Sequence, residues 1–420
     1  MPSDPDSDAS DPSALARLER AVAATPAAVR GRLARATAAL RGGDAARAAR
    51  LALEATREDD GALAWHVLAV AREQAGDFTA ALAAYQSAIT RLPDDAEIAN
   101  DLGRLAARMG MTEIAEQLFR RYLAAHPRSV GAASNLAAAL RDLGRGGEAV
   151  EVLRAAISAD PAQPLLWNTL GTILTAQGDM AGAIAFFDEA LRVAPAMAQA
   201  RYNRATAKLE LGDGEAAIAD CAQAITDAAT GEDRAMMALA LATMKLADGR
   251  IGEGWDDYEA RLDPHYAGAA VFDINLARWL PRSSLAGKKL LVMGEQGLGD
   301  EVLFASLLPD VLEALGARGR LAVAVEPRLV SLFQRSFPTA EILPHTTQRQ
   351  GGRNHRSAPP SAAEVWTPMA SLARRFRRGL SDFPDRKAFL TPDPARVAHW
   401  RAELAKAPAG RKVGILWKSM

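Results

Sequence analysis

Apolar residues recur at helical spacing through the first two thirds of the chain, in short segments that end at glycine or proline. Two segments, "LAWHVLAVAREQAGDFTAALAAYQSAITRLP" and "LLWNTLGTILTAQGDMAGAIAFFDEALRVAP", align without a gap at a multiple of 34 residues. The same comparison places leucine and alanine at fixed positions of successive units, namely Leu68, Leu102, Leu136 and Leu170, and Ala81, Ala115, Ala149, Ala183 and Ala217. The pattern predicts two helices per unit, A and B, repeated over residues 28–265.

The residues between the apolar stripes indicate how such a unit folds. Alanine lets helices A and B approach closely, glycine ends helix A, and proline prevents helix B from continuing. A single unit cannot cover its own apolar face, so the units are expected to stack into a right-handed solenoid with a concave inner surface. The unit resembles the tetratricopeptide repeat, in which tryptophan and a closing proline occupy the positions of Trp65, Trp167, Pro93, Pro127, Pro161 and Pro195. This resemblance implies a protein or peptide partner in the concave groove.

The two ends of the array follow the pattern less closely. Residues 1–27 open with the acidic, breaker-rich "MPSDPDSDASDP" and are predicted to be disordered or partly helical. After Gly231 the register slips, and we expect a modified last unit and a cap as far as residue 265. Trp255 and Tyr258 are expected to pack this cap against the domain that follows.

Asparagines recur on helix A, on or beside the face that would line the groove. They occupy two adjacent positions of the unit, Asn100 with Asn168 and Asn135 with Asn203. An asparagine side chain both donates and accepts hydrogen bonds, so these residues are candidates for clamping the backbone of an extended peptide. The alternative, ordinary polar residues on a solvated helix face, is favoured because exposed polar residues need no special explanation.

From about residue 268 the helical period is lost. Residues 266–286 contain proline, serines and glycine and are predicted to form a linker. The apolar run "KKLLVM" and the helical stripe "DEVLFASLLPDVLEALG" then begin an alternation of strands and helices that spans residues 287–410. Such alternation predicts a doubly wound, parallel, Rossmann-like sheet. The fold class is therefore α + α/β, a solenoid followed by an α/β domain.

One segment of this domain, "TTQRQGGRNHRSAPPSA" at residues 346–362, shows no period and is rich in glycine, proline and arginine. We expect a mobile loop here. Contact with an anionic ligand is the alternative, but loops of this kind normally lie in solvent.

The stretch "GEQGLGDEVLF", residues 294–304, lies at a predicted strand-to-helix turn, where parallel sheets bind ligands. Its glycines do not follow the dinucleotide-binding pattern, because Val302 stands where the third glycine belongs, and the lysine of a phosphate-binding loop is absent. Asp300 would lie at the start of the helix, where it either caps the helix or acts as a general base. The residue pattern alone gives these two roles equal weight.

This stretch, with "GWDDYEARL" upstream and "SLARRF", "FLTPD" and "KVGILWKS" downstream, resembles the bacterial glycosyltransferases that carry an N-terminal tetratricopeptide array. Their catalytic part is similar to the ADP-heptosyltransferase-like enzymes, which have two Rossmann domains in the GT-B arrangement. The resemblance implies that Asp300 activates the acceptor hydroxyl. It further implies acceptor contacts at Glu295, Gln296, Gly297 and Gly299. The donor would be a nucleotide sugar, and the acceptor flagellin or another surface protein.

Residues 411–420 resemble only the first strand of the second GT-B domain, which holds the nucleotide sugar in this family. We therefore expect the isolated 420-residue chain to lack the donor site and to be inactive. Two interpretations stay open. A fragment of a longer protein is favoured, because an end just after a buried strand would leave its neighbours uncovered. A natural short form without donor binding is the alternative.

Composition narrows the functional classes. The 50 basic and 51 acidic residues give a formal net charge of -1, which argues against a nucleic-acid binder. The opening residues lack the pattern of a secretory signal, and the sequence predicts no membrane span. The single cysteine, Cys221, fits a repeat core and a cytoplasmic location. The scattered histidines predict no metal site, and no cofactor is expected beyond the donor substrate.

Two functions remain. In the first, the array recruits a protein acceptor and the Rossmann pair transfers a sugar to it. In the second, the protein is a non-catalytic interaction scaffold, with the array as its working part. The two hypotheses differ in the effect expected from replacing Asp300.

Overall fold

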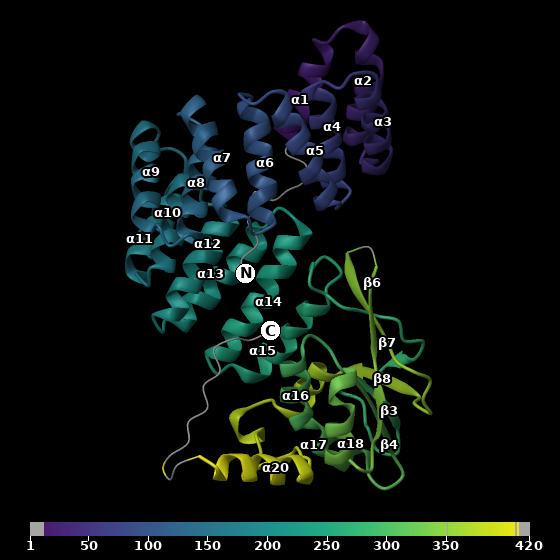
Figure 1. The fold of residues 1–420 in the computed structure, drawn as a ribbon. Helices are drawn as coiled ribbons and strands as arrows, with labels where there is room; N and C mark the ends of the chain where they lie inside the picture. The colour runs from purple at the N-terminus through teal and green to yellow at the C-terminus, as the bar shows by residue number, and fades with distance from the viewer. Residues whose placement is uncertain (1–11, 351, 408–409, 411–420) are drawn as a thin grey trace. The chain divides into compact units, whose positions relative to one another are not determined.

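The computed structural model describes residues 12–350, 352–407 and 410 of the chain (Figure 1). The chain divides into two compact units, residues 1–227 and 228–420. This division falls before residue 265, the predicted end of the array. The physical reason is that the last helices of the predicted array share an apolar core with the C-terminal sheet. The final predicted strand, residues 411–420, lies outside the described residues.

The N-terminal unit consists of helices that alternate between the A and B positions of the predicted repeat (Figure 1). The A helices are α2 (Ala27–Arg41), α4 (Ala62–Gln74), α6 (Ala96–Arg108), α8 (Val130–Asp142), α10 (Pro164–Ala176) and α12 (Ala198–Glu210). The B helices are α3 (Ala45–Glu58), α5 (Phe78–Arg91), α7 (Thr112–Ala125), α9 (Gly146–Ala159), α11 (Met180–Val193) and α13 (Gly214–Asp227). The predicted array of helix pairs is confirmed over these segments. A further helix, α1 (Pro12–Ala23), precedes them in the segment predicted to be disordered or partly helical.

A glycine with a left-handed backbone follows each A helix, as the sequence predicts. The φ angle is +77° at Gly76 and +84° at Gly178, a region that other residues avoid. The next residue then caps helix B in several units. The side chain of Asp77, for example, accepts a hydrogen bond from the Ala80 amide at 3.2 Å. Glycine and aspartate together therefore fix the tight A-to-B turn.

Gly171 of α10 lies where the two helices of one unit pack closely together. A Cβ atom at this position would lie 2.4 Å from Cε1 of Phe187 on α11, a ring that is fully buried. We expect Gly171→Ala to lower the free energy of unfolding by about 1–3 kcal/mol, because the ring has no room to move. Gly147→Ala on α9 is the control, since no atom lies within 4 Å of its Cβ position. The control should be neutral or stabilising by up to about 1 kcal/mol. Urea denaturation followed by circular dichroism checks the pair, and equal effects would contradict this account.

The C-terminal unit contains a five-stranded sheet in which every neighbouring pair is parallel. Its strand order is β2 (Ala277–Arg278), β8 (Val365–Pro368), β3 (Lys289–Met293), β4 (Arg320–Val325) and β5 (Glu341–Pro344). A second sheet contains β1 (Val271–Phe272), β7 (Arg353–Ser357) and β6 (Thr346–Gln350), in that order. The predicted parallel sheet is thus confirmed.

Short helices connect these strands. In chain order the helical elements are α14 (Gly231–Ala247), α15 (Ile251–Asp257), η1 (Tyr258–Leu262), α16 (Leu298–Phe304), η2 (Ala305–Leu307), α17 (Leu308–Leu315), η3 (Pro327–Leu329), α18 (Val330–Ser336), η4 (Met369–Leu372), α19 (Ala373–Phe376), η5 (Leu380–Asp382) and α20 (Pro394–Ala405). The cap packs as predicted, because the ring of Trp255 on α15 meets that of Phe304 at 5.9 Å between centroids.

Strand β3 is buried on both faces, which explains its uninterrupted apolar sequence. Leu290 and Val292 share a core with α17 and α18. Leu291 and Met293 face the opposite side, where the described residues packed against them come from extended segments rather than helices. The predicted double winding is therefore not seen in the described residues, since only one face of the sheet is covered by helices.

The predicted linker, residues 266–286, is part of the folded unit. It contributes β1 and β2, and the side chain of Trp279 is buried. Its proline and glycine content led to the linker prediction, but two-residue strands are too short to show an alternating pattern. None of the helices in the described part of the chain combines the length and apolar character that a membrane span needs.

Candidate functional site

The turn between β3 and α16 contains the glycine-rich stretch singled out in the sequence. Because β3, β4, β5 and β8 run parallel, their carboxyl ends meet at one edge of the sheet, and the turn lies at this edge. Gly294 lets the backbone of the turn lie close to the Glu301 carboxylate, since a Cβ atom at residue 294 would be 2.6 Å from that carboxylate. Gln296 has a φ of +63°, the only non-glycine residue with positive φ in the described part of the chain. Strain of this kind costs about 1–3 kcal/mol and is common at functional sites.

Arg356 holds the strained turn in place. Its Nη2 donates to the carbonyl of Gln296 at 2.6 Å, and its Nη1 donates to the carbonyl of Gly294 at 2.9 Å. The side chain is buried and comes from β7. Residues 346–350 and 353–357, predicted as part of a mobile loop, instead form the antiparallel strands β6 and β7. The missed signal is the Gly-Gly pair in the sequence of this segment, which is typical of hairpins.

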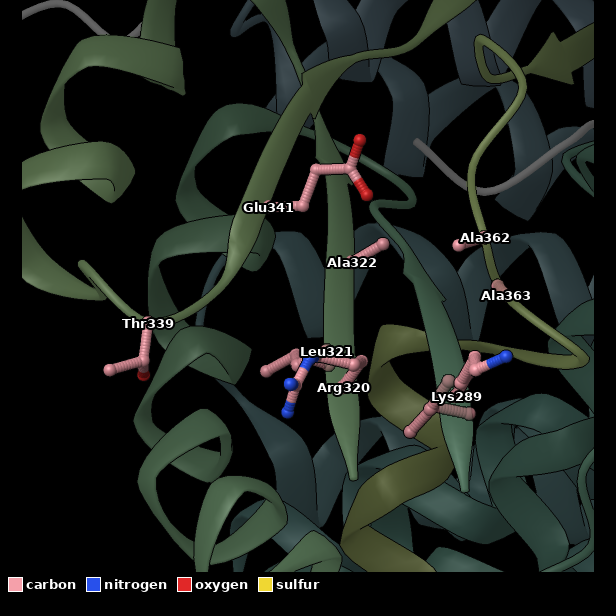
Figure 2. Close-up of a pocket in the computed structure, with 9 residues that line it drawn as sticks. Lys289, Arg320, Leu321, Ala322, Thr339, Glu341, Ala362 and Ala363 are labelled. Atoms are coloured by element: carbon pink, nitrogen blue, oxygen red, sulfur yellow. The ribbon is translucent and has the colours of Figure 1, made fainter. Parts of the chain in front are cut away.

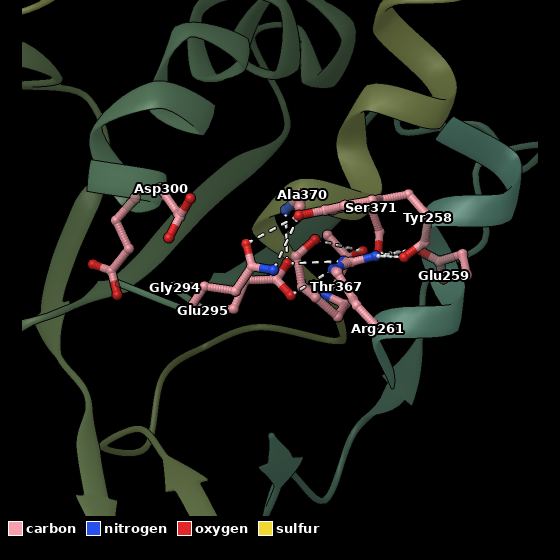
Figure 3. A network of polar contacts seen from close by, with 12 residues as sticks. Tyr258, Glu259, Arg261, Gly294, Glu295, Asp300, Thr367, Ala370 and Ser371 are labelled. Atoms are coloured by element: carbon pink, nitrogen blue, oxygen red, sulfur yellow. Dashed lines mark hydrogen bonds and ion pairs between the residues drawn. The ribbon is translucent and has the colours of Figure 1, made fainter. Parts of the chain in front are cut away.

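Asp300 is the predicted catalytic residue. Its Oδ2 accepts a hydrogen bond from the Gly297 amide at 3.0 Å, so the predicted capping interaction is present. The carboxylate is half-buried, and Oδ1 has no hydrogen bond among the described residues. Figure 3 shows Asp300 apart from the neighbouring polar network, with no contact drawn to it. Gly297 and Gly299 beside it are exposed, so the carboxylate is accessible from solvent.

Glu295 has a different environment from its neighbours in the turn. It is buried and forms two hydrogen bonds with the Arg261 guanidinium, Nε to Oε2 and Nη2 to Oε1, both at 2.9 Å (Figure 3). The Ala370 amide also donates to Oε1 at 2.8 Å. The carboxylate is therefore held by hydrogen bonds from the fold, but it also lines the cavity beside the turn, and the acceptor contact expected from the resemblance stays a prediction. Gln296 is exposed, and its amide pairs with the Tyr258 hydroxyl at 3.0 Å.

Arg261 links the cap to the sheet edge through several groups. Its Nη1 donates to Glu259 at 2.9 Å, and its Nη2 donates to the Ser371 hydroxyl at 2.9 Å. Burial opposes the charge of the guanidinium, but the two carboxylates outweigh burial and raise the pKa of Arg261. Burial also disfavours the charged form of Glu259, yet Arg261, Ser371 and Arg278 hold the pKa of this carboxyl below its usual value. Arg261 and Glu259 are thus both held in their charged forms by this network.

Glu301 forms a second buried cluster at the same edge. Its Oε2 accepts from the Glu326 amide at 2.8 Å, at the end of β4, and its Oε1 lies 2.9 Å from Nε2 of His345, just after β5. Arg356 Nη1 lies 3.5 Å from the same oxygen. The sequence did not identify Glu301, His345 or Arg356 as site residues. They are far apart along the chain, and only the parallel order of the strands brings them together.

A cavity of about 200 Å³ opens beside the turn. Arg261, Tyr266, Gln296, Asn354 and Arg356 are among the residues that line it. Nε of Arg356 is buried and has no hydrogen-bond partner among the described residues. Arginine is the usual partner of phosphate and carboxylate groups. The Glu295 carboxylate, paired with Arg261, also lines the cavity, so the lining suits a small polar group that can accept from Arg356.

A second cavity, of about 350 Å³, lies at the other end of the sheet (Figure 2). Its lining includes Lys289 and Arg320, the first residues of β3 and β4, and Glu341, the first of β5. Ligands of parallel sheets bind at the carboxyl ends of the strands. The smaller cavity, beside the strained turn, is therefore the better candidate.

The asparagines of the array fall into two pairs across neighbouring A helices. Nδ2 of Asn203 donates to Oδ1 of Asn168 at 3.0 Å, and Asn168 is buried. These two side chains therefore satisfy each other. Asn100 and Asn135 are half-buried, and neither forms a side-chain hydrogen bond to another described residue. We therefore propose Asn100 and Asn135, rather than Asn168 and Asn203, as the residues that clamp a peptide.

The equivalent contact between α4 and α6 joins His66 to Asp101, with Nε2 and Oδ2 at 2.8 Å. Burial disfavours the Asp101 carboxylate, but His66, Arg104 and Arg17 together lower its pKa. The stabilisation from a lowered pKa is complete above the unfolded value, about 3.9, and is lost as the pH falls through the folded value. We expect Asp101→Asn to cost about 1–3 kcal/mol at pH 7. Thermal melts should show this difference shrinking below about pH 4, and a difference that persists at pH 2 would contradict the assignment.

These features define a class of protein, a tetratricopeptide-repeat protein with a C-terminal domain built on a parallel sheet. The model of the tetratricopeptide repeat family matches residues 33–96, 66–130, 100–164, 135–196 and 168–233. The chain belongs to the family of Protein FlbA from Caulobacter vibrioides. The two are 49% identical over 419 residues, which cover 98% of this chain and 70% of that protein.

Two solved structures match part of the chain. A tetratricopeptide repeat protein from Parabacteroides merdae has a TM-score of 0.48 at 16% identity, over 60% of this chain and 91% of that chain. PilW, a type IV pilus biogenesis factor, has a TM-score of 0.44 at 22% identity, over 50% of this chain and 99% of that chain.

Proposed function

We propose that the protein is a glycosyltransferase component in which the repeat array recruits a protein acceptor and the edge of the parallel sheet carries the transfer site. The observation that carries this proposal is the accessible Asp300 carboxylate. It stands at the start of α16, directly after the strained turn, and Gln296 of this turn lines a cavity together with the buried arginines Arg261 and Arg356. The resemblance of the surrounding sequence to heptosyltransferase-like enzymes supports the same role for Asp300.

The chemistry follows from the two oxygens of this carboxylate. Oδ2 is oriented by the Gly297 amide, which leaves Oδ1 to accept the proton of an acceptor hydroxyl. The hydroxyl oxygen then attacks the anomeric carbon of a nucleotide sugar, and the bond to the nucleotide diphosphate breaks. Gln296 and the exposed glycines beside Asp300 would border the acceptor. We assign donor binding to a second domain, in keeping with the expected GT-B arrangement, and we propose a cytoplasmic location.

The array supports the recruiting role, because stacked repeats present an extended concave surface. We propose that the acceptor is flagellin or a similar surface protein. The test is the intact mass of flagellin from the same genome, produced with and without the full-length natural protein. An added mass that matches a sugar residue is expected. An unchanged mass would favour the second candidate, a non-catalytic interaction scaffold, which the repeat array alone also supports.

A further inference from the structure

The N-terminal helix α1 packs in an unusual place for a helix that precedes a repeat array. It packs against α2 and α4 (Figure 1). Its Arg17 forms ion pairs with Glu97 at 3.0 Å and Asp101 at 3.7 Å, both on α6. A helix in the ordinary stacking order would follow the B positions. Instead α1 crosses the A helices of three successive units.

The A helices line the concave surface of such an array, and burial shows that α1 covers it. Val70 of α4 is 8% exposed. The matching residues two, three and four repeats along are all half-exposed: Ala138, Thr172 and Thr206. Ala36, the residue of α2 that matches Val70, is buried as well. The concave surface is therefore closed by α1 over the first units and more open further along.

The contact is amphipathic and charge-complementary. Ala14, Leu18 and Val22 are spaced one helical turn apart on α1, and all three are buried. Leu18 and Val22 belong to the same apolar cluster as Val67 and Val70. Arg17, directly before Leu18, forms ion pairs with two carboxylates of α6. The concave surface formed by α2, α4 and α6 therefore complements a short amphipathic helix with an arginine near its centre.

We propose that α1 is an intramolecular occupant of the concave surface of the first three units, and that it competes there with a helical segment of the acceptor protein. The competing segment would share the chemistry of α1, two apolar residues four positions apart and one arginine. That the competing helix belongs to the acceptor protein rests on the proposed function. A free helix of twelve residues is marginal in water, so the order of α1 depends on docking. The connection to α2, Ala24 to Pro26, keeps the local concentration of α1 high.

The test uses the full chain and a labelled peptide of residues 12–23 as the probe. In the variant Leu18→Glu/Val22→Glu the tethered helix cannot dock, so the surface is free for the peptide. Fluorescence anisotropy should then show peptide binding at least about tenfold tighter than to the wild type. The control is Ala16→Glu/Ala21→Glu, which adds the same charge on the exposed side of α1 and should behave as the wild type. A peptide with Arg17→Glu should bind more weakly to the Leu18/Val22 variant.

Hydrogen exchange gives an independent readout on the same proteins. Amides of residues 16–23, beyond the first turn of α1, should be protected in the wild type and the control, and should exchange as in the free peptide in the Leu18/Val22 variant. Unprotected amides in the wild type, or equal peptide binding by all three proteins, would overturn the proposal. Neither readout uses an acceptor or a sugar donor, so both stand apart from the test of sugar transfer. Flagellin binding that is no tighter in the Leu18/Val22 variant would overturn the competition with the acceptor.

Discussion

Replacing Asp300 by asparagine is expected to lower sugar transfer by the full-length protein at least about 100-fold. Asparagine keeps the shape of the side chain and can still accept the hydrogen bond from the Gly297 amide. It cannot take up the proton of an acceptor hydroxyl. The fold and the turn should therefore be retained while the base is lost. The measurement is the initial rate of acceptor modification by mass spectrometry.

Asp382→Asn is the matched control for this substitution. Asp382 caps η5 with the same geometry, accepting from the Gly379 amide at 3.0 Å, and it is exposed. Any effect of losing a capping charge should appear equally in both variants. Transfer should remain near the wild-type rate in Asp382→Asn. Retained transfer in Asp300→Asn would show that another group is the base.

Replacing Arg261 by methionine is expected to lower the free energy of unfolding of the C-terminal unit by about 3–5 kcal/mol. Methionine fills a similar volume but leaves the buried Glu295 carboxylate without its cation. Only the Ala370 amide would still donate to that carboxylate among the described contacts. Hydrogen exchange of the β3 amides under increasing denaturant reports this unit separately from the array.

Arg278→Met serves as the comparison for Arg261→Met. Arg278 contacts the same Glu259 and Ser371, at 3.2 Å from the Ser371 hydroxyl, but its side chain is 38% exposed. An exposed ion pair contributes only about 0–1 kcal/mol, so this variant should be close to the wild type. Similar losses in the two variants would mean that burial of the Arg261–Glu295 pair is not the main source of stability.

The array could be predicted because its information is local and repeated. Glycine at the end of helix A, alanine at the helix contact and proline after helix B each act within one unit, and the 34-residue period confirms them several times. The asparagine pattern was less informative. The sequence placed these residues in two adjacent positions but could not show that Asn168 and Asn203 face each other across the gap between units.

The site could be predicted only in part. The role of Asp300 stays a prediction, which rests on its place after a buried strand and on the resemblance. The partners that shape the turn, Arg261 and Arg356, come from η1 and β7, and no local pattern links them to the glycine-rich stretch. The sequence also does not show that Glu295 is buried and paired with the distant Arg261. A carboxylate in a glycine-rich turn is expected to be exposed, and only the structure reveals its buried cation.

The central claim is that the array delivers the acceptor and the sheet edge carries out the chemistry. The most direct test compares kcat and KM for sugar transfer to flagellin by the full-length protein, by Asp300→Asn, and by the groove variant Asn100→Ala/Asn135→Ala. We predict that Asp300→Asn lowers kcat with little change in KM, and that the groove variant raises KM with little change in kcat. If both variants change the same parameter, or if the groove variant changes neither, the proposed division of roles is contradicted.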